Sequence, residues 1–300
     1  TKIILPLEDE EIALLTPLGI EIYDSNNERQ YRNPISLQIA EQSINKKNFR
    51  HYMLKEMFEQ PRAVANAINP YLDVDTKKVN FSNIGLDEAA SDSAALEKLH
   101  KAERIYIIAC GTSYYAGLYA KYLIEPLVKI PVDVDVASEF RYRDPVLDKN
   151  SVTLFISQSG ETADTLAALR LAKENGLTTM SLCNTRRSTI DREADLHLYM
   201  NSGVEIGVAS TKAFLSSLAV LNTLAIYLAE KTGKISGDEE KNFVESLLAL
   251  PSLMEGVLSY DSFFDKAADT LKDYKGFLYL GRGQSYPIAM EGALKMKELA

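Results

Sequence analysis

Few residues in this sequence could form covalent cross-links or hold a metal. The 300 residues include only two cysteines, Cys110 and Cys183, and three scattered histidines. The cysteines lack metal-ligand spacing, which argues against a zinc site or a disulfide framework and favours a reducing, cytoplasmic setting. Neither a Walker phosphate loop nor a G-x-G-x-x-G dinucleotide fingerprint follows an expected strand. We therefore expect no metal and no cofactor.

Positive charge is also scarce. The chain has 33 Lys and Arg against 42 Asp and Glu, for a net charge of −9. Such a chain repels nucleic-acid backbones and acidic lipid surfaces at long range, so neither is an expected partner. The longest charge-free apolar run, residues 213–229, is polar in places and shorter than the roughly 20 residues of a membrane span. We interpret it as a buried helix.

We expect no secretory signal at the start of this sequence. An acidic run, Glu8 to Glu11, stands where a signal peptide needs an uninterrupted apolar stretch. The first residue is Thr1 and not an initiator Met, so we expect a fragment or a processed chain.

The hydrophobic residues are arranged for an α/β fold. A composition of 46% hydrophobic and 25% charged residues is typical of a globular protein with a real core. From residue 104 onward, continuous apolar runs alternate with helical patterns, which indicates a parallel sheet covered on both faces. We expect strands over residues 104–110, 132–136, 152–157, 178–183 and 196–200, and helices over residues 51–68, 86–101, 114–127, 162–175, 213–229, 239–259 and 262–273.

A later part of the chain is similar to an earlier one. ACGTSYYAG at residues 109–117 and LGRGQSYPIA at residues 280–289 each place a glycine-containing loop and a Ser-Tyr pair after an apolar run. This similarity predicts an internal duplication, with a strand over residues 276–280 opening the second copy. Because one strand and one helix cannot bury their apolar surfaces, we expect the second copy to be truncated at Ala300.

Three loops that follow expected strands are rich in hydroxyl groups. They are CGTS at residues 110–113, SQSGET at residues 157–162 and GVASTK at residues 207–212. Parallel α/β sheets bind ligands at this edge, where a helix N-terminus and nearby hydroxyls can hold a phosphate monoester without a basic patch. Helix capping alone would explain the hydroxyls of any single loop equally well. SQSGET, however, offers more donors than one cap needs.

The end of the chain carries three charged residues on one helical face. Glu291, Lys295 and Glu298 are spaced at i, i+4 and i+7, so they project in the same direction. Taken alone, such a group is most simply a solvated helix surface with an ion pair. Its position after the second glycine loop favours a ligand-facing role.

These motifs resemble the isomerase half of the glutamine–fructose-6-phosphate aminotransferase (glucosamine-6-phosphate synthase) family, which is built from sugar isomerase (SIS) domains. The resemblance rests on ACGTSYYAG, ISQSGETADTLAALR, VEIGVASTKAF and EGALKMKE, and it covers residues 51–300. It implies a three-layer α/β/α sandwich with a parallel sheet. It also implies three parts: the end of a glutaminase-like domain plus linker at residues 1–50, N-terminal helices with the first SIS domain at residues 51–270, and a truncated second SIS domain at residues 271–300.

The family converts fructose 6-phosphate and ammonia, released from glutamine in its other half, into glucosamine 6-phosphate. The resemblance implies that the phosphate is bound by Ser113, Ser157, Gln158, Ser159 and Thr162, and that the sugar site is lined by Thr112, Val208 and Ser210. Glu298 matches the glutamate that moves a proton between C1 and C2, and Lys295 and Glu291 match the charged residues that support it.

Some of the family's chemical groups have no match in this sequence. Its N-terminal cysteine nucleophile is absent, and its ring-opening histidine and Schiff-base lysine would lie beyond Ala300. The resemblance therefore implies sugar-phosphate binding with poor turnover, in a cytoplasmic homodimer that works with a glutaminase domain. The alternative is a non-catalytic SIS module that senses a sugar phosphate. Glu298, Lys295 and the glutaminase-like start favour the enzyme.

Overall fold

The computed structural model describes residues 3–8, 10–36, 45–81 and 93–299, which divide into two compact units, Thr1–Asn45 and Lys46–Ala300. In the first unit, three antiparallel strands form one sheet, and β1 pairs with β5 in another. Most of the large apolar side chains described in this unit are exposed. The strands of this unit are β1 (Ile3–Ile4), β2 (Ile12–Thr16), β3 (Gly19–Tyr23), β4 (Arg29–Gln30) and β5 (Ile35–Ser36).

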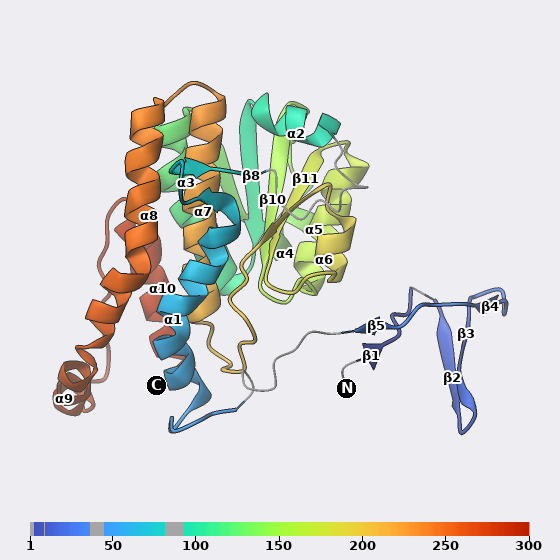
Figure 1. The fold of residues 1–300 in the computed structure, drawn as a ribbon, viewed down its shortest axis with the longest axis horizontal. Coiled ribbons are helices and arrows are strands. Elements are labelled where there is room, and N and C mark those ends of the chain that lie inside the picture. The colour runs from blue at the N-terminus through green and yellow to red at the C-terminus, as the bar shows by residue number, and fades with distance from the viewer. Residues whose placement is uncertain (1–2, 9, 37–44, 82–92, 300) are drawn as a thin grey trace. The chain divides into compact units, whose positions relative to one another are not determined.

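A five-stranded parallel sheet forms the centre of the second unit (Figure 1). The strand order is β12-β11-β10-β8-β9. The chain therefore runs from β8 to β9 on one side, and then crosses to β10, β11 and β12 on the other side. The carboxyl ends of β8 and β10 therefore flank the point where the winding reverses, which is where open parallel sheets bind ligands. The strands are β8 (Arg104–Ala109), β9 (Val132–Val136), β10 (Ser151–Ser157), β11 (Thr178–Cys183) and β12 (Leu196–Tyr199).

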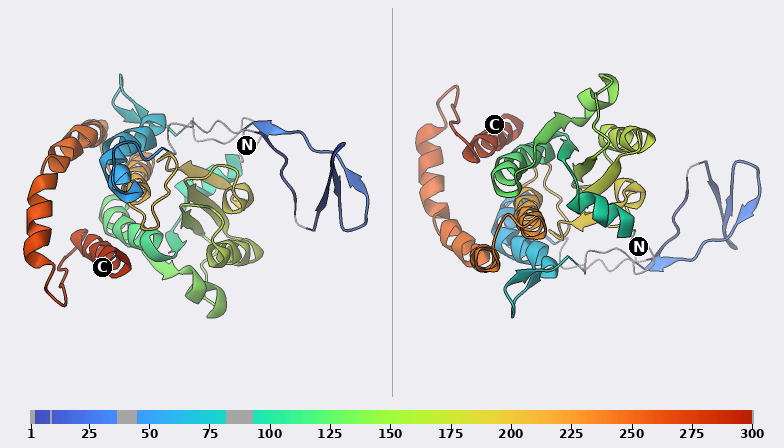
Figure 2. Two further views of the ribbon diagram at one scale, coloured as in Figure 1. Left: turned by 90° about the horizontal axis from the view of Figure 1, so that it is seen from below. Right: turned by 90° about the horizontal axis from the view of Figure 1, so that it is seen from above.

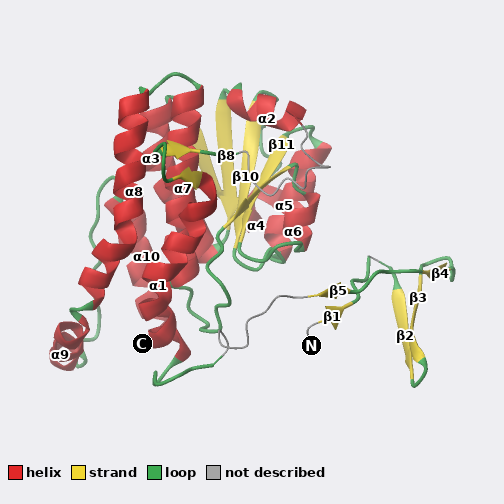
Figure 3. Ribbon diagram, in the orientation of Figure 1, coloured by secondary structure: helices red, strands yellow, loops and turns green. Residues whose placement is uncertain are grey.

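Helices cover both faces of this sheet, which gives the expected three layers (Figure 3). Side chains alternate along each strand, so Ile107 packs with the helices of one face and Ile108 with those of the other. One face carries α1 (Tyr52–Ile68), α3 (Gly111–Val128) and α7 (Lys212–Lys231), and the other carries α4 (Ala137–Tyr142), α5 (Ala163–Glu174) and α6 (Thr189–Glu193).

The long apolar helix is a core element. By length and composition α7 could cross a membrane, but 78% of its apolar window is buried inside the structure. It packs between α1 and α3, and α8 packs against α1 and α7. The interpretation of residues 213–229 as a buried helix is therefore confirmed.

The remaining elements of the second unit lie around this core. The described part of the helix expected over residues 86–101 is α2, and residues 86–92 of that prediction lie outside the described residues. These elements are the 3-10 helix η2 (Asn69–Tyr71), the paired β6 (Leu72–Asp73) and β7 (Lys78–Val79), α2 (Ser93–His100), α8 (Gly237–Leu258), α9 (Asp261–Leu271) and α10 (Ser285–Leu299).

The strand expected over residues 276–280 does not form, so that prediction is wrong. This segment connects α9 to α10 without regular structure, and Leu278 and Leu280 are almost fully exposed. A strand needs a neighbour for its backbone hydrogen bonds, and no described segment pairs with this one. The apolar run is therefore not sufficient for a strand. The helix that follows, α10, packs against α3 (Figure 2).

We expect Gly117→Ala to destabilise the second unit, because Gly117 lies where α3 approaches the sheet. An added Cβ would lie 2.8 Å from Ile107 Cγ2 and 3.2 Å from Val134 Cγ1. This overpacking should lower the free energy of unfolding by about 1–3 kcal/mol in a denaturant titration. Gly256→Ala in α8 is the matched control, since nothing lies within 4 Å of its added Cβ. The control should be neutral or stabilising by up to about 1 kcal/mol. Equal effects of the two substitutions would contradict this packing.

Candidate functional site

The three hydroxyl-rich loops meet at the carboxyl edge of the sheet. Residues from all three line one small cavity of about 90 Å³. The predicted site residues that line it are Thr112, Ser113, Gln158 and Ser210, and the other lining residues are Cys110, Met200, Ala213, Phe214 and Ser217. Loops separated by tens of residues in the sequence therefore contribute to one site.

The SQSGET loop is shaped by its own hydroxyls. Ser157 Oγ accepts a 3.0 Å hydrogen bond from Gly160 N–H and lies 3.1 Å from Thr162 Oγ1. Ser159 Oγ accepts a 3.2 Å hydrogen bond from Glu161 N–H. Thr162 is the N-cap residue of α5, yet its side chain makes no capping hydrogen bond. The hydroxyls of this loop thus do not serve as the helix cap, which was the simplest alternative explanation for them.

The charged face of α10 is half buried. Lys295 Nζ lies 3.3 Å from Glu291 Oε1 and 2.7 Å from Glu298 Oε2. The exposed fractions of the side chains rise from 6% for Glu291 to 18% for Lys295 and 39% for Glu298. A solvated surface pair would be exposed throughout, so burial argues against that interpretation of this face.

Thr112 joins the first hydroxyl loop to this face. Its hydroxyl donates a hydrogen bond to Glu291 Oε1 at 3.0 Å and accepts one from Lys295 Nζ at 3.1 Å. Burial raises the pKa of Glu291, and Lys295 and Thr112 offset only part of that rise. The other oxygen, Glu291 Oε2, is buried and has no hydrogen-bond partner among the described residues. Glu291 is therefore a carboxyl that takes up a proton more readily than usual.

Glu205, a residue that the sequence analysis missed, organises the third loop. Its Oε2 accepts a 2.9 Å hydrogen bond from the Ser210 hydroxyl. Its Oε1 accepts hydrogen bonds from the N–H groups of Thr211 at 2.8 Å and Ala213 at 3.3 Å. Glu205 therefore supplies the acceptors at the N-terminus of α7, where the side chain of the N-cap residue Thr211 forms no cap.

Glu56, also missed, fixes the other side of this loop. Its carboxylate on α1 is 1% exposed and accepts hydrogen bonds from Ile206 N–H at 2.6 Å and Gly207 N–H at 3.1 Å. Nearby, Lys212 Nζ donates to Glu59 at 2.8 Å, so a second carboxylate of α1 holds the start of α7. Acidic residues on a helix look like surface charges in a sequence, and no spacing signal distinguishes these two.

Four of the eight predicted binding residues do not line the small cavity, and neither do the three charged residues of α10. Ser157, Ser159 and Thr162 lie in the SQSGET loop that borders it, and Val208 is fully exposed. The roles assigned to all the site residues by the resemblance stay predictions.

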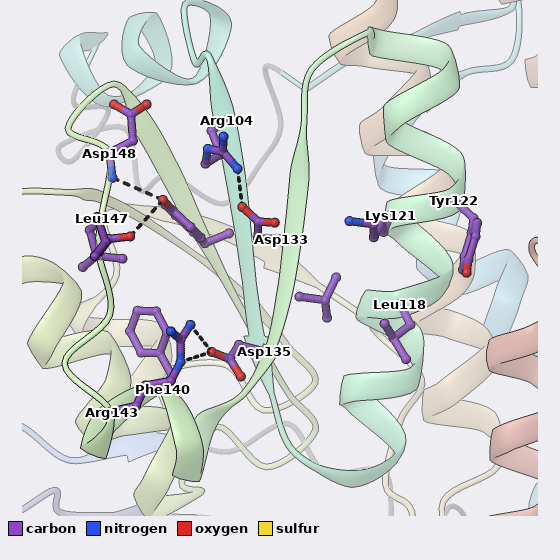
Figure 4. Close-up of a pocket in the computed structure, with 13 residues that line it drawn as sticks. Arg104, Leu118, Lys121, Tyr122, Asp133, Asp135, Phe140, Arg143, Leu147 and Asp148 are labelled. Atoms are coloured by element: carbon purple, nitrogen blue, oxygen red, sulfur yellow. Dashed lines mark hydrogen bonds and ion pairs between the residues drawn. The ribbon is translucent and has the colours of Figure 1, made fainter.

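A larger cavity of about 730 Å³ lies beside the edge strand β9, and none of the predicted site residues lines it (Figure 4). Its charged groups neutralise one another. Arg104 pairs with Asp133, and Arg143 contacts Asp135 Oδ2 at 2.6 Å. This cavity therefore lacks an unpaired charge cluster of the kind that selects an ionic ligand. Across the described parts of the chain, no group of three or more His, Cys, Asp or Glu side chains is placed to hold a metal ion.

Comparison with known proteins gives consistent results. The SIS domain family matches residues 98–227. The glutamine–fructose-6-phosphate aminotransferase [isomerizing] of Brucella abortus biovar 1 is 44% identical over 300 residues, which is all of this chain and 48% of that protein. The Pectobacterium atrosepticum protein of the same name is 42% identical over 304 residues, again covering 100% of this chain and 48% of the relative. The chain thus spans about half the length of these relatives.

A solved structure shares both sequence and fold with the chain. It is the C-terminal domain of glucosamine-fructose-6-phosphate aminotransferase from Francisella tularensis, with a TM-score of 0.78 and 41% identity. The match covers 85% of this chain and 68% of that one. Tagatose-6-phosphate ketose/aldose isomerase from Escherichia coli, at 18% identity and a TM-score of 0.59, shares the fold.

We expect Thr112→Val to destabilise the contact between α3 and α10. The substitution keeps the size of the side chain but removes the hydroxyl that satisfies both Glu291 and Lys295. The free energy of unfolding should fall by about 1–3 kcal/mol in a denaturant titration, because a buried carboxyl loses a donor. Thr112→Ser keeps the hydroxyl and should stay much closer to the wild type. Unchanged stability in Thr112→Val would show that the two hydrogen bonds of the Thr112 hydroxyl do not stabilise the packing of α10 against α3.

Proposed function

Because this chain belongs to the glutamine–fructose-6-phosphate aminotransferase family and corresponds to its SIS-domain isomerase half, we propose that it binds fructose 6-phosphate and catalyses its isomerisation. In the complete enzyme, ammonia from glutamine would make the product glucosamine 6-phosphate. The observation that best supports this proposal is the hydrogen-bonded tie from Thr112 to Glu291 and Lys295. It joins a hydroxyl-rich loop suited to a sugar phosphate with a charged face suited to proton transfer.

In this proposal the phosphate is bound by the SQSGET loop together with Ser113. Thr162 leaves the N-terminus of α5 without a side-chain cap, so backbone N–H groups and the positive end of the helix dipole remain for an anion. Ser157, Ser159 and Gln158 would add neutral donors. The sugar would then extend toward Thr112, Ser210 and Val208.

Glu298 is the proposed base that moves the proton between C1 and C2. It is the most exposed member of the α10 face, so it can reach a ligand, and its 2.7 Å contact with Lys295 restrains it. The ammonium group would also stabilise negative charge that develops on the sugar during enolisation. Glu291 makes a 3.3 Å ion pair with Lys295 and would hold it from the buried side of the helix.

We also propose that the 300-residue chain forms product poorly, while Glu298 still exchanges the C1 proton of the open-chain ketose that is present in solution. The resemblance assigns ring opening to a histidine and Schiff-base formation to a lysine, and neither has a matching residue in this sequence. A homodimer, a glutaminase domain as partner and a cytoplasmic location are further proposals that rest on family membership.

We expect Glu298→Gln to bind fructose 6-phosphate but to lose proton transfer. The amide keeps the shape of the side chain and cannot act as a base. In D₂O, the wild type should exchange the C1 proton of fructose 6-phosphate with solvent, detected by proton NMR. The variant should be slower by about 100-fold or more, since general base catalysis contributes roughly that much. Its affinity in calorimetry should stay within about threefold of the wild type, because the phosphate contacts remain.

The same measurements separate this function from the alternative. A wild-type chain that binds fructose 6-phosphate without any proton exchange would support the non-catalytic sensing module. Wild-type exchange rates in Glu298→Gln would show that another group is the base.

A further inference from the structure

A buried carboxylate lies directly behind the SQSGET loop. Asp191 in α6 is 3% exposed. Its Oδ1 accepts a 3.4 Å hydrogen bond from Ser181 Oγ and lies 3.2 Å from His197 Nδ1. Its Oδ2 accepts hydrogen bonds from Tyr199 Oη at 3.2 Å and from Arg187 N–H at 2.7 Å. One carboxylate therefore ties together β11, β12 and the turn that precedes α6.

These contacts favour the charged form of Asp191. Burial raises the pKa of Asp191, but the hydrogen bonds from His197, Arg187 N–H and Tyr199 lower it by more, and the net pKa is below the usual range. A buried carboxylate is costly unless it is fully hydrogen-bonded. Its partners here come from separate segments, so the position of the turn is coupled to the charge of Asp191.

The turn that Asp191 holds is the support of the SQSGET loop. Three hydrogen bonds run from the turn and the start of α6 to this loop: Asn184 N–H to Gln158 O at 3.2 Å, Thr189 N–H to Glu161 Oε1 at 2.8 Å, and Ile190 N–H to Gly160 O at 3.0 Å. These bonds hold the loop at its beginning, at its tight turn and just before α5. A shift of the turn would therefore move the backbone groups that face the ligand.

The turn packs tightly against the SQSGET loop at Gly160. Gly160 has a φ of +70°, and a Cβ added there would lie 1.8 Å from Ser188 Oγ. Ser188 itself is 4% exposed, and its Oγ has no hydrogen-bond partner among the described residues. Packing and the neighbouring backbone hydrogen bonds place Ser188 against the loop. The loop backbone therefore follows any displacement of this turn.

We propose that Asp191, braced by His197, is a positioning residue that sets the geometry of the phosphate-binding loop through residues 184–190. The inference rests on the proposed function, because it concerns the same loop. Binding groups must be held to within about 0.5 Å of their productive positions, and supporting hydrogen bonds behind a site provide that accuracy. Asp191 lines neither of the two cavities described above, so we expect it to act only through the turn.

The chain offers a matched control for a merely structural role. Asp195 also hydrogen-bonds to β11, where its Oδ2 accepts from Thr179 N–H and Thr179 Oγ1, both at 2.8 Å. These bonds lie at the beginning of the strand, whereas the SQSGET loop follows the end of the neighbouring strand β10. Asp195→Asn should therefore lower stability without disturbing the loop.

The test compares Asp191→Asn with Asp195→Asn. Calorimetry with fructose 6-phosphate, below the unfolding temperature of each variant, should show affinity weakened by about tenfold or more in Asp191→Asn. Amide hydrogen exchange should become faster at Asn184 and Ile190 in the same variant. Asp195→Asn should keep both the affinity and these exchange rates within about twofold of the wild type.

The possible outcomes distinguish the two proposals. A wild type that does not bind fructose 6-phosphate would contradict the proposed function itself. Binding in the wild type that is unchanged in Asp191→Asn, with only stability lowered, would overturn the positioning role alone.

If Asp191→Asn does not fold, His197→Gln removes one hydrogen-bond partner of Asp191, at a side chain that is 16% exposed. It should weaken binding by about threefold or more, and unchanged affinity there would overturn the proposal.

Discussion

Backbone N–H groups that are partly shielded from water need acceptors, and the loops at the carboxyl edge of this sheet depend on that requirement. Here three acidic side chains supply the acceptors. Glu205 accepts from the first turn of α7, Glu56 from the preceding loop, and Asp191 from the turn before α6. Glu205 joins its own loop to the start of α7, Glu56 joins α1 to that same loop, and Asp191 joins α6 to the turn before it. The loops around the small cavity are positioned in this way.

The N-termini of α5 and α7, which both lie at this edge, differ in whether a carboxylate accepts from their backbone N–H groups. Glu205 occupies the amides at the start of α7, whereas the N-cap residue of α5, Thr162, forms no side-chain cap. If carboxylates blocked both ends, only side-chain donors such as Ser157 and Ser159 would remain for an anion at these two loops. The difference is consistent with the proposed anion site in a chain with a net charge of −9. The donors are local, and long-range charge contributes little at contact distance in the presence of salt.

The sequence predicts local features better than contacts between distant segments. The strands expected over residues 132–136 and 178–183 coincide with β9 and β11, because the pattern of neighbouring residues, such as the alternation of Val and Asp over residues 132–136, is local information. The spacing of the α10 face is likewise a local property of a helix. The contact of Thr112 with Glu291 spans 179 residues and depends on how α3 packs against α10. Pairing of strands is also non-local, which is why the apolar run at residues 276–280 was wrongly expected to be a strand.

Accessibility changes along the α10 face in a way that suits proton transfer. A base that must reach a ligand needs solvent access, but a freely rotating side chain is a poor base because it is rarely in the right place. Glu291 is nearly buried and tied to Thr112, Lys295 is intermediate, and Glu298 is 39% exposed. The ammonium group of Lys295 contacts both carboxylates, so the anchored Glu291 also limits the motion of Glu298. An anchored inner carboxyl and an accessible outer one thus satisfy both requirements with a single shared cation.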